Sequence, residues 1–254
     1  MSKESSHYAQ QYAEHNDWQL ERGKRLLAVA NPKEGQSVLD VGCGTGELSL
    51  GLARAVSPTG KVFALDPDGE RLKIARASVP PEIDNIIFLE EGAEEIKGVE
   101  SASVDLAFSN YVLHWIADKG KALREIARCL RTDGRLVMEC VAGWSLEAER
   151  ITTTMGKNVE EIMLAIRDRQ HFIDQDQWMR LFHEHGFTVE HIETFDVRLE
   201  FMNLATFHDW FEASTHGLFR REMLTDDSMR RVREEYPGKV VHDMQAFQAV
   251  VQKR

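Results

Sequence analysis

A short apolar stretch that breaks into closely spaced glycines constrains the fold more than any other part of the chain. Residues 38–47 read VLDVGCGTGE, with an apolar run that carries one acid, Asp40, followed by Gly42, Gly44 and Gly46. Glycine-rich turns of this kind join a buried strand to a helix and let the backbone approach a ligand closely, often a phosphate. The stretch therefore predicts a strand, a ligand-binding turn and the start of a helix.

Strand and helix patterns alternate around this turn. We predict helices at Asp17–Ala30, Glu47–Ala55, Gly69–Ser78 and Lys119–Leu130. Short apolar strands are expected at Ser37–Val41, Lys61–Leu65, Asn85–Leu89, Ser103–Phe108 and, after a turn at Thr132–Gly134, Arg135–Cys140. Such alternation is typical of a parallel sheet with helices on both faces, in which ligands bind at the carboxyl ends of the strands.

The pattern changes beyond Trp144. We expect helices at Glu147–Arg169 and, capped by Asp174, at Gln175–His185, then a strand at Thr188–Phe195 and a last strand at Met244–Lys253. Between these strands, Leu199–Met223 is rich in large apolar side chains, namely Phe201, Met202, Phe207, Trp210, Phe211 and Phe219. They indicate either cap helices packed over the ligand edge of the sheet or ordinary core.

Together these elements predict an α/β fold, a doubly wound and mostly parallel seven-stranded sheet with an inserted helical cap. We expect residues 1–35 to form an N-terminal helical segment that contributes to the substrate site. Residues 36–145 would form the cofactor-binding core, and residues 146–254 the cap helices and the final strands.

Charge and composition narrow the classes of partner. The formal net charge of −11 argues against nucleic acid, whose phosphates are bound through lysine and arginine. The polar N-terminus does not resemble a signal peptide, and no apolar run reaches the ~18 residues of a membrane helix. Three scattered cysteines suit reduced thiols, and neither cysteine nor histidine shows metal spacing. We therefore expect a cytoplasmic protein that acts on a small molecule, away from membranes and without a metal ion.

Two acids at the glycine turn argue against a dinucleotide. In a dinucleotide-binding turn, the third small residue falls where this chain has Glu47. Glu47 and Asp40 would repel a pyrophosphate, whereas they suit a ligand with an ammonium, a sulfonium and no phosphate. A Tyr-x-x-x-Lys pair, expected of a nicotinamide oxidoreductase, is also missing from the sequence, because Tyr236 is followed by Pro-Gly-Lys. An oxidoreductase and a non-catalytic cofactor-binding module remain remote alternatives.

Four motifs resemble those of class I S-adenosylmethionine-dependent methyltransferases over about residues 20–140. They are VLDVGCGTG, VFALDPD, VDLAFSNYVLHWIAD and LRTDGRLVMEC. The resemblance implies S-adenosylmethionine as cofactor and a Rossmann-like methyltransferase fold. It implies that Asp66, about twenty residues beyond the turn, accepts hydrogen bonds from both ribose hydroxyls and that Pro67 lies by the adenine. The other cofactor-binding residues it implies are Asp40, Gly42, Cys43, Gly44, Gly46, Ser109 and Asn110, with Cys43 as a small packing residue.

The adenine side departs from the family pattern. Methyltransferases of this kind commonly carry Asp-Ala after the third strand, but here Gly92 precedes Ala93. The Ala93 amide can still donate to the adenine, whereas the exocyclic amine loses its usual acceptor. Either Glu91 or Glu94 replaces it, or both belong to a solvated acidic loop.

The substrate end is suggested by two separated residues. Asn16 and Gln19 share a helical face, and the fourth-strand motif ends in Leu113-His-Trp115. The pairing resembles the carboxylate-methylating branch of juvenile hormone acid, trans-aconitate and malonyl-carrier-protein methyltransferases. In the closest of these, residues matching Gln19 and Trp115 hold the substrate carboxylate. The alternatives are a general base, His114, for a phenol or amine, a packed His114, and an exposed Gln19.

Overall fold

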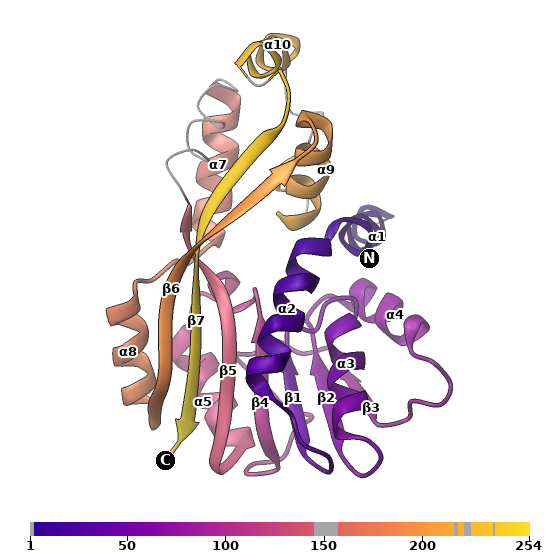
Figure 1. Cartoon of the computed structure of the whole chain (residues 1–254), viewed down its shortest axis with the longest axis vertical. Coiled ribbons are helices and arrows are strands. Elements are labelled where there is room, and N and C mark those ends of the chain that lie inside the picture. Colours follow the sequence, from indigo (N-terminus) through magenta and orange to yellow (C-terminus); the bar gives the residue numbers. More distant parts are fainter. Residues whose placement is uncertain (1–2, 145–156, 216–217, 221–224, 236) are drawn as a thin grey trace.

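The computed structural model describes residues 3–144, 157–215, 218–220, 225–235 and 237–254. A seven-stranded sheet of order β3-β2-β1-β4-β5-β7-β6 forms its centre, with helices packed on both faces (Figure 1). The strands are β1 (Ser37–Val41), β2 (Lys61–Leu65), β3 (Ile86–Leu89), β4 (Val104–Asn110), β5 (Leu130–Trp144), β6 (Phe187–Phe201) and β7 (Val240–Lys253). β7 pairs antiparallel with both β5 and β6, and the other strand pairs of this sheet are parallel. The predicted mostly parallel α/β fold is therefore confirmed.

The strand order reverses beside β1. The chain runs outward from β1 through β2 to β3 and then returns to β4, which pairs with the other side of β1. At such a switch point the connections leave in opposite directions, so that a crevice opens beyond the carboxyl ends of the two strands. Asp40 near the end of β1 and Asn110 at the end of β4 lie at this edge.

The helices expected at 17–30, 47–55, 69–78, 119–130 and 175–185 are present, with ends that differ by at most one residue. The helices of the structure are α1 (Lys3–His15), α2 (Asp17–Ala30), α3 (Glu47–Val56), α4 (Gly69–Ser78), α5 (Lys119–Cys129), α7 (Lys157–Arg169), α8 (Gln175–Glu184), α9 (Leu204–Ser214), α10 (Asp226–Glu235) and the short 3₁₀ helix η1 (Leu113–Trp115). The expected Asp174 cap is confirmed, because its side chain accepts from the Gln177 N–H within a capping box. The sequence pattern predicted neither α1 nor α10. Of the helix expected at 147–169, residues 147–156 lie outside the described part of the chain.

The strands at the carboxyl half are longer than predicted. The turn expected at Thr132–Gly134 lies inside β5, where pairing with β4 jumps from Val104–Leu130 to Leu106–Arg135. Asp133 takes a left-handed conformation there, so the segment bulges instead of ending the strand. β6 and β7 pair over almost their entire lengths and extend past the sheet as a twisted ribbon beside α9 (Figure 1). This ribbon supports the cap.

Three of the four apolar clusters contain most of the buried apolar residues in the described part of the chain. One lies between the sheet and α5 and α8, and a second lies between the sheet and α2 and α3. The third belongs to the cap and contains Ile166, Leu204, Phe207, Trp210, Phe211, Phe219 and Val240. The large side chains of 199–223 are thus mostly core of the cap itself, although Met202 is 74% exposed.

A buried ionic network fixes α2 against the sheet. Arg22 on α2 donates through Nε and Nη2 to the two carboxylate oxygens of Glu139 on β5, each at 2.8 Å. The Tyr111 hydroxyl, just beyond β4, donates to the same carboxylate at 2.6 Å. Glu139 is 1% exposed, so its charge depends on these two donors.

Two further findings concern membrane-spanning helices and metal binding. Within the described residues, no helix is long and apolar enough to cross a membrane. The same residues contain no group of three or more His, Cys, Asp or Glu side chains that could hold a metal ion.

We expect Arg22→Ala to lower the free energy of unfolding by about 3–5 kcal/mol, because it leaves a buried carboxylate without its cation. Arg25→Ala is the matched control on the same helix. Its partner Glu21 lies at 3.6 Å and both side chains are more than half exposed, so the loss should be below about 1 kcal/mol. Urea denaturation of the three proteins measures both values. Equal losses in the two variants would contradict a structural role for the Arg22–Glu139 pair.

Candidate active site

A cavity of about 760 Å³ opens at the carboxyl ends of β1, β2 and β4. The glycine turn, the loop after β3 and α4 bound one end of it. The other end is bounded by the first residues of α2, by η1 and by the last residues of α9. Of the residues that sequence analysis assigned to the site, the cavity is lined by Gln19, Asp40, Gly42, Cys43, Gly44, Asp66, Pro67, Gly92, Ala93, Glu94, Asn110, His114 and Trp115.

The two remaining residues lie outside the cavity lining. Ser109 is fully buried, and its hydroxyl donates to the Val41 carbonyl at 3.2 Å. Gly46 faces α4, where an added Cβ would lie 2.9 Å from the Cβ of Ala75. Both residues therefore shape the turn from behind.

The glycine turn depends on left-handed backbone conformations. Gly42, Gly44 and Gly46 have φ values of 75°, 56° and 90°, which side chains with a Cβ rarely adopt. A Cβ on Gly42 would also lie 2.3 Å from a methyl group of Val112. The N–H groups of Gly42 and Cys43 both donate to the Leu65 carbonyl, at 2.8 and 2.9 Å. The turn is thereby tied to the end of β2, next to Asp66.

Asp66 organises the backbone around it. Its carboxylate accepts from the N–H groups of Gly44 and Asp68, both at 2.9 Å. Burial raises the pKa of Asp66, although the Arg71 guanidinium and the two N–H groups oppose the rise. Each carboxylate oxygen retains a lone pair, so Asp66 can accept two further hydrogen bonds from a ligand.

Asp40 is a second buried carboxyl group beside the turn. It is 2% exposed, and its Oδ2 accepts from the Ser49 hydroxyl on α3 at 2.5 Å. Burial raises the pKa of Asp40 to about 7, with a smaller contribution from the charge of Asp66. Two carboxyl groups that are costly to ionise favour a ligand with a positive charge.

The glycine turn also holds Glu47 in place. The Thr45 hydroxyl contacts both oxygens of Glu47, at 2.8 and 2.7 Å. The first turn of α3, where the backbone would otherwise receive a phosphate, thus presents a fixed acid.

The loop after β3 carries the two acids, Glu91 and Glu94, that are candidates for the adenine side. The carboxylate of Glu91 accepts from the N–H groups of Lys97 and Gly98 and so closes its own loop, away from the cavity. Glu94 lines the cavity, and its carboxylate accepts from the Asp118 N–H at 3.3 Å. A Cβ on Gly92 would meet nothing within 4 Å. Position 92, where related methyltransferases commonly carry Asp, therefore has room for a side chain.

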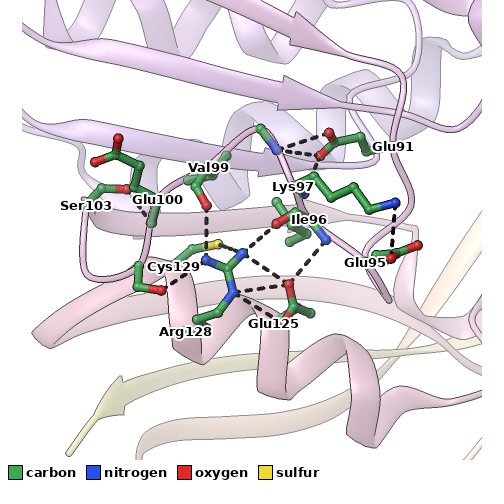
Figure 2. Close-up of polar contacts among 12 residues, drawn as sticks. Glu91, Glu95, Ile96, Lys97, Val99, Glu100, Ser103, Glu125, Arg128 and Cys129 are labelled. Carbon is green, nitrogen blue, oxygen red and sulfur yellow. Dashed lines mark hydrogen bonds and ion pairs between the residues drawn. The ribbon is translucent and has the colours of Figure 1, made fainter.

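Arg128 and Glu125 on α5 hold this loop against the core. Figure 2 shows Arg128 donating to the carbonyl groups of Ile96 and Val99, while Glu125 accepts from the Ile96 N–H. Glu125 and Arg128 also pair with each other at 3.0 Å. The loop that carries Gly92, Ala93 and Glu94 is therefore positioned from α5, a contact that no local sequence motif signals.

The unpredicted helix α1 covers the cofactor end. The Tyr12 ring lies 4.1 Å below the Arg71 guanidinium and lines the cavity. A Cβ on Gly44 would lie 3.6 Å from the same ring. Tyr12 and Arg71 thus belong to the site. The sequence signal that could have found α1 is the spacing of Tyr8, Ala9 and Tyr12 on one helical face.

At the substrate end, Gln19 is buried and not an exposed helix residue. Its Nε2 donates to the Ser214 hydroxyl on α9 at 3.2 Å, and its backbone carbonyl accepts from Asn110 Nδ2 at 3.1 Å. Asn16 is also buried and lines the cavity, as the shared helical face indicates. A hydroxyl can donate or accept, so Ser214 can hold the Gln19 amide in either orientation.

His114 and Trp115 lie on η1 and line the cavity. His114 is 3% exposed, and its Nδ1 accepts from the Val141 N–H at 3.4 Å. Burial lowers the pKa of His114 to about 3, and the positive charge of Lys119 adds to the effect. With Nδ1 as an acceptor, the proton of the neutral ring resides on Nε2, so His114 is a donor toward other groups.

Comparison with known proteins gives a consistent family. A model described as "Methyltransferase domain" matches residues 32–186. An uncharacterized methyltransferase from Schizosaccharomyces pombe is 30% identical over 183 residues, which are 67% of this chain and 66% of that protein. A demethylmenaquinone methyltransferase from Halalkalibacterium halodurans is 32% identical over 126 residues, 50% of each chain. An uncharacterized protein in a Streptomyces fradiae transposon is 37% identical over 115 residues, 44% of this chain and 32% of that protein. The chain thus spans about one third to two thirds of these relatives' lengths.

Solved structures agree at the level of the fold. The YcgJ protein of Bacillus subtilis has a TM-score of 0.65 at 16% identity, over 91% of this chain and 97% of that chain. A geranyl diphosphate methyltransferase in complex with GPP and sinefungin has a TM-score of 0.58 at 18% identity, over 92% of this chain and 78% of that chain. At these identities the likeness concerns the fold.

The raised pKa of Asp40 makes stability depend on pH. The folded value of about 7 exceeds the unfolded value of about 3.9, so the folded state binds this proton more tightly. The stabilisation of the folded state by this proton is therefore fully present below pH ~4 and is lost as the pH rises through ~7. In the absence of ligand, the free energy of unfolding of Asp40→Asn, taken relative to that of the parent, should rise by roughly 2.5 kcal/mol from pH 5 to pH 7.5. Urea denaturation at both pH values tests this, and a pH-independent difference would contradict it.

Proposed function

This chain belongs to the methyltransferase domain family and uses S-adenosylmethionine, and we propose that it methylates a carboxylate of a mainly apolar small molecule. When bound, the cofactor supplies an electrophilic methyl group on a sulfonium. The residues of the cavity determine what that methyl group meets.

The donor set at the glycine turn fits this cofactor. We assign Asp40 to the ammonium of its methionine part and Asp66 to the ribose hydroxyls, because both are buried carboxyl groups in the cavity wall. Gly42 and Gly44 would let the backbone approach the ligand. Pro67, Ala93 and Glu94 lie in the same wall, where the adenine would bind. The acids Asp40 and Glu47 oppose a phosphate-bearing ligand.

The burial of His114, whose Nδ1 already accepts from the Val141 N–H, is the observation that carries the choice of nucleophile. A histidine with a pKa of about 3 holds its proton too weakly to act as a base for a phenol or an amine near pH 7. A carboxylate is already ionised at that pH and needs no base. The uncharged donors of Gln19, Trp115 and His114 could orient a carboxylate without neutralising it. Methylation would then depend on alignment at near-attack distance.

The remaining wall of the cavity supports an apolar substrate. Trp18, Val141, Trp210, Phe211 and Met244 line it beyond the donors. The net charge of −11 favours a small molecule over nucleic acid. The three cysteines are free and buried, which suits the cytoplasmic location that we propose with this function.

A second candidate comes from the relatives. Two of them, from Halalkalibacterium halodurans and Lactococcus lactis, are named demethylmenaquinone methyltransferases, and each matches 50% of this chain. A ring substrate of the demethylmenaquinone type would also suit an apolar cavity. It belongs in any substrate panel.

Gly92→Asp should strengthen cofactor binding. Because a side chain at this position meets open space, the new carboxylate can supply the acceptor that the adenine amine lacks. We expect a gain of about fivefold in affinity for S-adenosylhomocysteine, the worth of roughly 1 kcal/mol. Gly238→Asp adds the same charge at an open position away from the cavity and should change nothing. Titration calorimetry measures both, and unchanged or weaker binding by Gly92→Asp would place the adenine elsewhere.

A substrate panel with labelled cofactor tests the nucleophile. Fatty and terpenoid acids, phenols, amines and a demethylmenaquinone are assayed with the parent, Gln19→Ala, Trp115→Phe and His114→Ala. We expect methyl esters from an acid, and losses of about 10- to 100-fold in kcat/KM for Gln19→Ala and Trp115→Phe, from lost hydrogen bonds to a charged group. Gln10→Ala, on the exposed face of α1, is the control.

The panel can also refute the proposal. If only His114→Ala abolished turnover, while Gln19→Ala and Trp115→Phe remained active, carboxylate capture would be wrong. The nucleophile would then be a phenol or an amine activated by His114.

A further inference from the structure

A buried positive charge lies next to the substrate end of the cavity. Lys119, the first residue of α5, is 5% exposed, and no other lysine in the described part of the chain is buried. Its Nζ donates to the Ile116 carbonyl at 2.9 Å. Within the residues that the structure describes, no carboxylate forms an ion pair with it.

This placement is unfavourable for the folded protein. Burial lowers the pKa of Lys119 to about 8, which reports the cost of keeping the ammonium away from water. The side chain also stands in the first turn of α5, where the positive end of the helix dipole disfavours a cation. A buried charge kept at such a cost without an anionic partner is typical of a functional site.

The ammonium lies directly behind the wall that would meet the substrate. Ile116, whose carbonyl it contacts, lines the cavity together with His114 and Trp115. Its charge reaches that wall, because it helps to lower the pKa of His114. The donors proposed to touch the carboxylate are an amide, an indole and a neutral imidazole, so none of them carries a charge.

We propose that Lys119 is a positioning residue that makes the cavity select anionic over neutral substrates, by a positive potential supplied from behind η1. The proposal rests on the proposed function, because it assumes that the nucleophile is a carboxylate. Lys119 does not touch the substrate. Its charge holds the anion at the donors of Gln19 and Trp115 while leaving the carboxylate oxygen free to attack.

The groups around Lys119 leave its charge largely uncompensated. His114 on η1 and Cys140 on β5 interact with it, and both are neutral near pH 7, since burial lowers the pKa of the imidazole and raises the pKa of the thiol. Asp118 precedes it, but this exposed carboxylate accepts from the Lys121 N–H. Glu94 accepts from the Asp118 N–H and faces the cofactor end.

A matched pair of ligands tests the proposal. Decanoate and decanamide differ in charge and hardly in shape, and their affinities are measured with S-adenosylhomocysteine bound. For the parent at pH 7, we expect decanoate to bind about tenfold more tightly. The preference should fall to about one in Lys119→Met and persist in Lys119→Arg. Lys121→Met, which removes an exposed lysine two residues on, should keep it.

A pH series on the parent needs no variant. With S-adenosylhomocysteine kept saturating at each pH, the preference for decanoate over decanamide should decay above pH ~8, where Lys119 loses its proton. A preference that persists to pH 10, or that survives in Lys119→Met, overturns the role of Lys119 and leaves carboxylate methylation standing. A parent that binds both ligands equally and methylates phenols overturns the proposed function, and this inference with it.

Discussion

The ion pair between Arg22 and Glu139 fixes the position of α2 relative to the sheet. Through it, α2 is fixed to β5, and Tyr111 joins the end of β4 to the same carboxylate. The Tyr111 ring in turn packs edge-on against Trp18, at 4.6 Å between centroids. Because Trp18 and Gln19 are neighbours on α2, the network places the start of α2 over the ligand edge of the sheet. A buried pair of this kind adds little net stability compared with apolar residues, but it specifies one arrangement, since any other would leave Glu139 buried without a cation.

The charges around the cavity are divided between its two ends. Asp40 and Asp66 stand at the cofactor end, where burial makes their ionisation costly until a cation arrives. Lys119 lies behind the opposite end, where burial makes its ammonium costly until an anion arrives. A sulfonium bound between them would have carboxylates behind it and an anionic nucleophile in front. Under the proposed function, two bound ligands of opposite charge would relieve the cost of these buried charges at both ends of the cavity.

The sequence predicts those parts of the molecule whose causes are local. The glycine turn requires left-handed backbone at Gly42, Gly44 and Gly46, and because glycine favours that conformation, the three glycines predict the turn. Asp66 follows an apolar strand, so its position at the sheet edge can be predicted from periodicity. Ser49, Ser214 and Lys119 could not be identified in this way, because their roles arise from packing between elements distant in sequence. The length of β6 and β7 was missed for a similar reason: their outer halves form strands only because they pair with each other under the cap.

The same distinction explains why the substrate is harder to infer than the cofactor. Cofactor contacts come from strand ends that the sheet topology brings together in any protein of this fold. The end of the cavity that we assign to the substrate is formed by α2, η1 and α9, and the Gln19–Ser214 side-chain pair joins α2 to α9. A donor such as arginine in direct contact would bind a carboxylate more strongly, but it would also draw electron density from the attacking oxygen. Neutral donors in contact, with a buried ammonium one layer behind, separate attraction from neutralisation. That arrangement favours an anion that must still react over one that need only be held.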